Sequence, residues 1–151
     1  MKKLFLFVSA VALTVMLNSC SSDSGTSIGG TITMKINGTS KTFNTVVVYE
    51  NTLGEETELT VMGTETDATG SVTFLLRKGD VGANVIYYFE YYNGLIYYDY
   101  SGFSTSVTIN STGNRLAGAF SGTLLGYYDN GGGTTDSMSV AITNGTFSVQ
   151  Y

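Results

Sequence analysis

The sequence predicts an all-β fold: a single-domain antiparallel meander of about ten strands, forming a β-sandwich or a flattened barrel. Three observations support this prediction. From residue 30 onward apolar and polar residues alternate with a period of two, and no 3.6-residue period is present. Turn residues recur about every ten residues. Three Asn-Gly pairs, at 37–38, 93–94 and 144–145, match the two-residue turns of β-hairpins.

The alternation and the turn residues together define the strands. We expect strands over 30–36, 41–49, 57–63, 71–77, 83–92, 95–101, 104–110, 114–126, 136–143 and 146–151. The first two strands meet at Asn37-Gly38, where two registers are open. A two-residue loop pairs Met34 with Lys41, whereas a four-residue loop pairs Met34 with Phe43.

Acidic residues gather around the third strand. Glu55, Glu56 and Glu58 lie at its start, and Glu65 and Asp67 follow its end. We interpret them as a solvated acidic edge, which discourages edge-to-edge pairing with other sheets.

The hairpin over 85–100 is the most aromatic stretch of the chain. An Asn93-Gly94 turn sets Tyr92 opposite Leu95 and divides the hairpin into two faces. The face without charge is expected in the core: Val85, Tyr87, Phe89, Tyr91, Ile96, Tyr98 and Tyr100. The other face is expected in solvent, because unpaired carboxylates are costly to bury: Ile86, Tyr88, Glu90, Tyr92, Leu95, Tyr97 and Asp99.

The solvent face yields the candidate binding patch, which consists of Tyr88, Glu90, Tyr92, Tyr97 and Asp99. Tyrosine rings flanked by carboxylates are typical of surfaces that bind glycans or proteins. A purely structural interpretation also stands, since tyrosine is common on half-exposed sheets.

The remaining strands carry small residues and one loop of interest. Gly118 and Gly122 share a side with larger apolar residues, which leaves room for tyrosine rings from a neighbouring strand. The loop 127–136 contains Asp129, Asn130 and Asp136, but it lacks the spacing of a dedicated calcium site, so we expect a plain hairpin loop. The last two strands are expected to pair through Asn144-Gly145, with one apolar face: Met138, Val140, Ile142, Phe147, Val149 and Tyr151.

Composition excludes several functions. The chain has no histidine, so a Ser-His-Asp or Cys-His arrangement cannot form and zinc loses its commonest ligand. The net charge of −5 opposes binding to nucleic acid. We therefore expect no catalytic residue, metal or cofactor, and a monomer. Two alternatives stay open: a lipocalin-like carrier of an apolar ligand, and a glycan-active enzyme that uses a carboxylate pair such as Glu90 and Asp99.

The amino-terminal segment is typical of a signal peptide. Lys2 and Lys3 precede an apolar run over 4–17, which is shorter than the roughly 18–20 residues that span a bilayer. It ends in Leu17-Asn18-Ser19-Cys20, which resembles the bacterial lipobox. That resemblance implies cleavage between Ser19 and Cys20, a diacylglycerol thioether on Cys20, and anchoring to a membrane through this lipid. We expect residues 1–19 to be removed, 20–29 to form a flexible tether, and 30–151 to form the domain, of about 120 residues.

Four stretches of the sequence carry a wider resemblance: "SCSSDS", "TITMKINGTSKTF", "LAGAFSGTLL" and "ITNGTFSV". They resemble the small uncharacterised lipoproteins of Bacteroidota, especially those of flavobacteria. The resemblance implies an all-β domain anchored by lipid in the outer membrane, on its periplasmic or its surface face, and it implies no particular activity. Asp136-Ser137-Met138 also resembles the short O-glycosylation sequence of that phylum.

Overall fold

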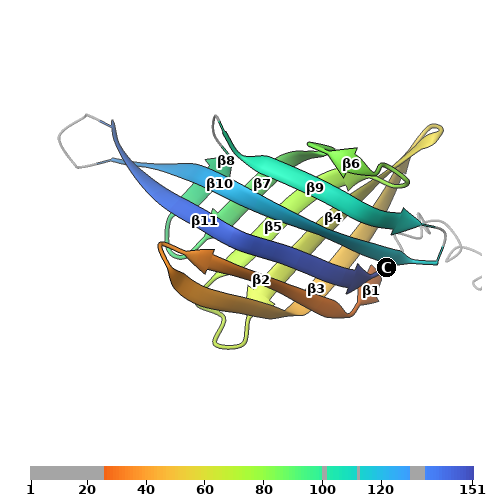
Figure 1. Cartoon of the computed structure of the whole chain (residues 1–151), viewed down its shortest axis with the longest axis horizontal. Coiled ribbons are helices and arrows are strands. Elements are labelled where there is room, and N and C mark those ends of the chain that lie inside the picture. Colours follow the sequence, from red (N-terminus) through yellow and green to blue (C-terminus); the bar gives the residue numbers. More distant parts are fainter. Residues whose placement is uncertain (1–25, 100–101, 112, 130–134) are drawn as a thin grey trace, which may run out of the picture.

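The computed structural model describes residues 26–99, 102–111, 113–129 and 135–151 (Figure 1). This part of the chain contains strands and turns but no helix, as the period-two pattern predicts. The strands are β1 (Thr26–Ile28), β2 (Gly30–Ile36), β3 (Thr39–Leu53), β4 (Glu56–Glu65), β5 (Ser71–Arg77), β6 (Gly82–Ala83), β7 (Ile86–Tyr92), β8 (Ile96–Asp99), β9 (Ser104–Ser111), β10 (Arg115–Asp129) and β11 (Thr135–Gln150). β1 lies within residues 20–29, where the sequence predicts a flexible tether.

The strands form one antiparallel sheet that follows the chain order and closes on itself. β2, β3, β4, β5, β7, β8 and β10 are neighbours in that order, and β11 pairs with both β10 and β2. β8 and β9 pair with successive parts of the same edge of β10, since Tyr97 lies opposite Gly126 and Thr105 lies opposite Phe120. The predicted meander is therefore confirmed, in a ring-like form that encloses one core (Figure 1).

Aromatic side chains fill the inside of the ring. The ring of Phe74 lies 5.0 Å from that of Phe147 and 6.0 Å from that of Phe89, measured between centroids. Phe120 lies 4.7 Å from Phe89, and all four side chains are buried. Aliphatic residues from every long strand surround this cluster, including Ile32, Val48, Val61, Leu76, Leu116, Leu124 and Val149. Packing of this kind removes apolar area from water and leaves the hydrogen-bonded strands as the wall.

The first Asn-Gly pair forms the turn that its sequence predicts. Ile36 lies opposite Thr39, and Asn37 and Gly38 both have positive φ, of 48° and 85°. The loop therefore has two residues, and Met34 pairs with Lys41. The open choice of register is resolved in favour of the shorter loop.

The Asn144-Gly145 pair is not a turn, and this prediction was wrong. Residues 135–150 form the single strand β11, and Asn144 (φ 52°) lies at a β-bulge within it. Phe120 lies opposite Gly145 while Gly122 lies opposite Ile142, so β11 carries one extra residue. That residue keeps Ile142 and Phe147 on the same inner face, where both are buried. The predicted inner face is correct for most of its residues, although Met138, near the hairpin end, is 49% exposed.

One carboxylate of the expected acidic edge is buried. Glu65 is only 8% exposed, and its carboxylate lies 3.0 Å from the Lys41 ammonium. The Thr69 hydroxyl also donates to it, at 3.2 Å. Glu65 therefore belongs to a largely buried ion pair and not to a solvated edge, because Lys41 compensates its charge.

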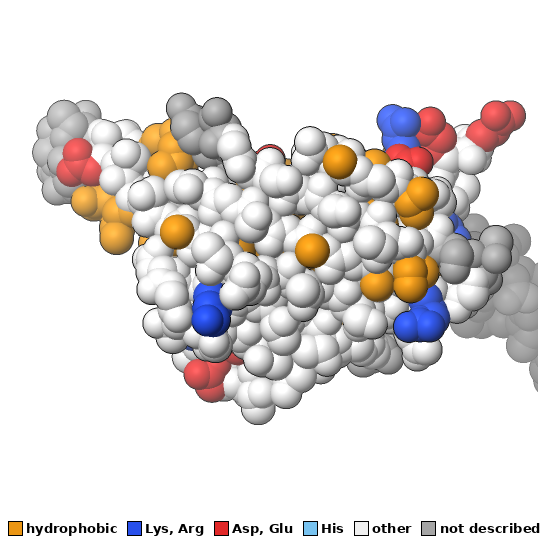
Figure 2. Space-filling view, in the orientation of Figure 1, with side chains coloured by type: hydrophobic (Ala, Val, Ile, Leu, Met, Phe, Trp, Pro, Cys, Tyr) orange, Lys and Arg blue, Asp and Glu red, His pale blue; other side chains and the backbone are white. Residues whose placement is uncertain are grey.

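The face of the ring seen in Figure 2 is mostly uncharged and polar. It is formed by β2, β9, β10 and β11, whose outward residues are largely serine, threonine and alanine. Few hydrophobic side chains appear on it, and they gather mainly near the two ends of the ring. This face therefore presents hydroxyl groups rather than rings or charges.

Gly118 provides the space that the sequence analysis expects of it. A Cβ at this position would clash with the carbonyl oxygen of Ser106 and with the Phe147 ring. A neighbouring aromatic side chain does occupy the space, although it is a phenylalanine and not a tyrosine.

We predict that Gly118→Ala lowers the free energy of unfolding by about 1–3 kcal/mol, because the added methyl group overpacks the core and displaces backbone. Urea denaturation followed by circular dichroism measures the change. Ala119→Ser, on the exposed neighbouring residue, is the matched control and should change stability by less than about 0.5 kcal/mol. Equal stability of the two variants would contradict this account of Gly118.

Candidate binding surface on the outer face

The β7–β8 hairpin differs from its predicted register by one residue. Tyr92 lies opposite Ile96 and not opposite Leu95, so the loop has three residues. Gly94 has a φ of 95° within that loop. A glycine in the left-handed region suits a three-residue hairpin as well as a two-residue one. Because side chains alternate along a strand, a shift of one residue exchanges the two faces of β8.

The exchange moves Tyr97 out of the predicted patch and brings Tyr98 into it. Tyr97 is 5% exposed, and its ring lies 6.0 Å from that of Tyr91 inside the ring of strands. Tyr98, expected in the core, is 40% exposed, and Ile96, also expected there, is 38% exposed. Asp99 is exposed at the end of β8, as predicted. Tyr100 lies outside the described residues.

A β-bulge in β7 changes the predicted faces at a second point. Leu75 lies opposite Tyr88, whereas Leu76 lies opposite Ile86, so Tyr87 is an extra residue in β7. Ile86 is consequently buried and Tyr87 is half exposed, the reverse of both predictions. Tyr87 and Tyr88 both project outward, side by side along the strand, because the bulge interrupts the alternation.

The outer side of β7 and β8 carries what we call the tyrosine face. It consists of Tyr88, Glu90, Tyr92, Ile96 and Tyr98. Glu90 lies opposite Tyr98, and the Tyr88 and Tyr98 rings meet edge to face at 6.2 Å. Three of the five predicted patch residues, Tyr88, Glu90 and Tyr92, belong to this face.

Carboxylates fix the position of the Tyr88 ring. The Tyr88 hydroxyl donates a hydrogen bond to Glu90. Burial raises the pKa of the Tyr88 hydroxyl, and the Glu90 carboxylate raises it further, with a smaller contribution from Asp99. Tyr88 is therefore a neutral donor, and its ring is held against the sheet.

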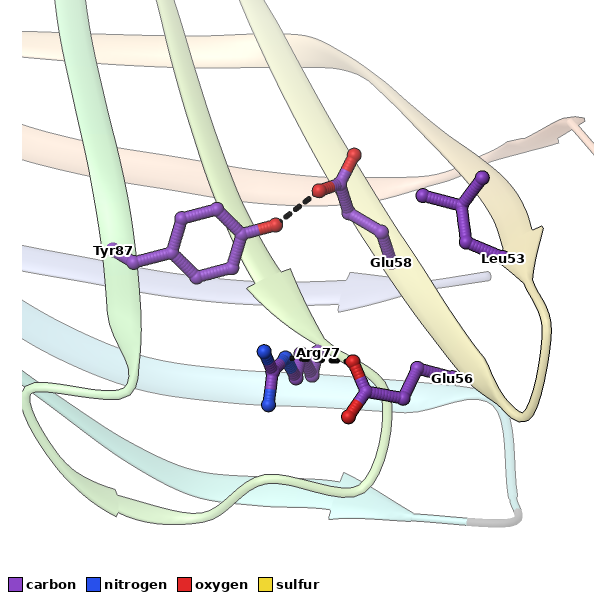
Figure 3. Close-up of a pocket in the computed structure, with 5 residues that line it drawn as sticks. All are labelled: Leu53, Glu56, Glu58, Arg77 and Tyr87. Atoms are coloured by element: carbon purple, nitrogen blue, oxygen red, sulfur yellow. Dashed lines mark hydrogen bonds and ion pairs between the residues drawn. The ribbon is translucent and has the colours of Figure 1, made fainter.

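A shallow pocket of about 300 Å³ lies beside the tyrosine face (Figure 3). Its lining residues come from four strands and their ends: Leu53, Glu56, Glu58, Arg77 and Tyr87. In Figure 3 the Tyr87 hydroxyl points across β5 toward Glu58, to which it donates a hydrogen bond. The Arg77 Nε lies 3.3 Å from a carboxylate oxygen of Glu56. Each carboxylate of the pocket therefore already has one donor.

Burial raises the pKa of the Tyr87 hydroxyl to about 12, and the hydrogen bond to Glu58 acts in the same direction. The sequence does not predict this pocket. Its pattern places Glu56 and Glu58 in a solvated edge and Tyr87 in the core. The bulge that turns Tyr87 outward cannot be seen in the sequence. Tyr87 and Tyr88 are the same residue type, so the pattern is the same whichever of them points outward.

The calcium ligands and the glycosylation serine that the sequence suggests belong to the β10–β11 hairpin and its loop. No group of three or more His, Cys, Asp or Glu side chains that could hold a metal ion occurs among the described residues. Of the considered calcium ligands, Asp129 and Asp136 lie at the end of the β10–β11 hairpin, and Asn130 lies outside the described residues. Ser137 is exposed on β11, opposite Tyr127.

The residues that bear on the membrane lie largely outside the described part. Cys20 and the apolar run over 4–17 belong to residues 1–25, whose structure is not described. Within the described ranges no helix has the length and hydropathy needed to cross a bilayer.

We predict that Tyr97→Ala lowers the free energy of unfolding by about 3 kcal/mol or more, because it empties a buried site that holds an aromatic ring. Tyr98→Ala should change stability by less than about 1 kcal/mol, because that ring is largely outside. Chemical denaturation of both variants tests the observed register. The opposite ranking would restore the register expected from the sequence.

Comparison with protein-family models, with curated proteins and with solved structures finds no match for this chain. Its function is therefore argued from its own residues.

Proposed function

We propose that the protein is a lipid-anchored lipoprotein of the bacterial cell envelope, held in the outer membrane, with a non-catalytic role in binding glycan or protein. The observation that carries the binding role is the tyrosine face. Its tyrosine rings lie on the outer side of the sheet, beside carboxylates, and they do not pack in the core. Exposed aromatic area with adjacent polar groups is typical of a binding surface.

The lipobox-like sequence supports the anchor, and the position of β1 supports an orientation in which its end of the ring lies nearer the membrane. Thr26 follows Cys20 by six residues, which span at most about 20 Å when extended. β1 pairs with the Tyr49 region of β3, and the Gln150 amide donates to the Gly29 carbonyl. The strand β1 and the carboxyl terminus thus lie at one end, and the long β10–β11 hairpin extends from the other (Figure 1).

The filled interior favours surface binding over a lipocalin-like carrier. Phe74, Phe89, Phe120 and Phe147 occupy the centre, where a carrier would hold its ligand. The position of the carboxylates favours binding over glycan cleavage. Glu90 lies on the outer side of β7 and Asp99 is exposed at the end of β8, and neither of them lines the pocket.

We predict that a fatty-acid probe fed to cells labels the full-length protein, and that Cys20→Ser abolishes the label and releases the protein from the membrane fraction. In-gel detection of the probe and fractionation of the envelope measure the two effects. Ser21→Ala is the control and should keep both the label and the location. An unlabelled parent protein, or a Cys20→Ser variant that keeps the label, would refute the anchor.

A further inference from the structure

We infer that the pocket and the tyrosine face form one continuous site for a neutral glycan chain. This inference rests on the proposed binding role and specifies its ligand. The two parts are adjacent because Tyr87 lines the pocket and Tyr88 belongs to the tyrosine face. The bulge at Tyr87 turns both side chains outward, and bulges of this kind commonly redirect a side chain toward a functional site.

The hydroxyl groups of the two tyrosines are already used. Tyr87 donates to Glu58, and Tyr88 donates to Glu90. The rings are held in place by these bonds, so a ligand does not have to order them on binding. What each ring offers to a ligand is its flat apolar face, which matches the C–H face of a sugar ring.

The hydrogen-bonding groups around the rings are mostly acceptors. Glu56, Glu58 and Glu90 supply carboxylate oxygens, and Arg77 is the pocket's single basic residue. Each ionised carboxylate accepts several hydrogen bonds, so acceptor sites remain beyond the one donor that each carboxylate has here. A ligand that fits must therefore bring donors, and sugar hydroxyls do so without adding charge.

The charges select against anionic ligands. Three carboxylates against one guanidinium repel a polyanion such as a uronate or sulfated glycan. A polycation is not repelled, because Tyr87 and Tyr88 are neutral donors and only Glu56 has a cationic partner, so a cationic probe belongs in the test. A neutral, hydroxyl-rich chain avoids the repulsion and also offers flat C–H faces to the tyrosine rings.

The size of the surface indicates a chain rather than a single sugar. The pocket of about 300 Å³ is at the lower limit for small-ligand sites. From Tyr87 to Tyr92 the strand runs a further distance of roughly 17 Å, at about 3.3 Å per residue. One sugar ring in the pocket and several along the tyrosine face would fill this length.

The test measures binding of the full-length protein, purified in detergent, to defined hexasaccharides by isothermal titration calorimetry. The probes are neutral hexasaccharides of glucose, mannose and xylose, a hexagalacturonate as the acidic counterpart, and hexalysine as a cation. We expect at least one neutral hexasaccharide to bind, with little dependence on salt, and hexagalacturonate not to bind.

Three variants locate the site. Tyr87→Ala and Tyr98→Ala should each weaken binding of that hexasaccharide by about tenfold or more, since Tyr87 lines the pocket and Tyr98 lies in the middle of the tyrosine face. Tyr128→Ala is the matched control: it removes a ring that is 40% exposed, as Tyr98 is, but lies on β10 outside the site, and it should leave affinity unchanged. Circular dichroism confirms that each variant is folded.

Several outcomes would overturn the inference: no neutral hexasaccharide binds, binding survives both Tyr87→Ala and Tyr98→Ala, or only hexagalacturonate or hexalysine binds. The anchor is tested separately by the label on Cys20. A protein that carries the lipid label but binds no glycan would refute the glycan site and support the anchor. A protein that binds glycan but carries no label would refute the anchor and support the glycan site.

Discussion

The pairing of β11 with two partners is the constraint on which the rest of the structure depends. Along one edge it pairs with β10 from Gln150 to Thr135, and along the other it pairs with β2. This closure gives β2, β3, β4, β5, β10 and β11 neighbours on both sides, whereas the outer edge of β9 pairs only with the two residues of β6. It also brings Phe147 and Val149 against residues from the first half of the chain. The chain's single cysteine is Cys20, so closure depends on hydrogen bonds and apolar burial rather than on disulfides.

Much of the fold could be predicted because one cause underlies two patterns. The apolar and polar residues that alternate in the sequence are the residues that alternate between the inside and the outside of the ring. A strand with one face inside the ring must alternate, and β2 and β5 have the bounds that the alternation predicts. The Asn-Gly pairs show that local sequence alone does not determine where the chain reverses. Asn37-Gly38 forms a turn and Asn144-Gly145 a bulge, although both asparagines have positive φ. The dipeptide specifies a backbone conformation, and the strands on either side decide whether the chain reverses there.

The candidate site could be predicted less well, because the register of a strand can be predicted only where its two faces carry different kinds of side chain. In β7 and β8 tyrosines occupy both inward and outward positions, so a shift of one residue leaves the pattern almost unchanged. The outward position of Glu90 could be predicted, because an unpaired carboxylate is costly to bury. Tyr88 and Tyr92 lie two residues before and after it on the same strand, so their outward positions could be predicted as well. The position of Tyr97 was predicted wrongly, because the loop after Tyr92 has three residues and the prediction assumed a turn of two residues. Tyr87 was missed because its outward position depends on a bulge.

The pairing of β2 with β11 also determines when the fold of this chain can be completed. Phe147 and Val149 lie opposite Ile32 and Gly30, so more than 110 residues separate each from its partner, and the ribosome adds β2 long before β11. Contacts so distant in sequence form slowly, and until β11 is available the edges of β2 and β10 that pair with it lack that neighbour. Any chaperone that accompanies the nascent chain has those two edges to shield, and a product that lacks β11 would retain them.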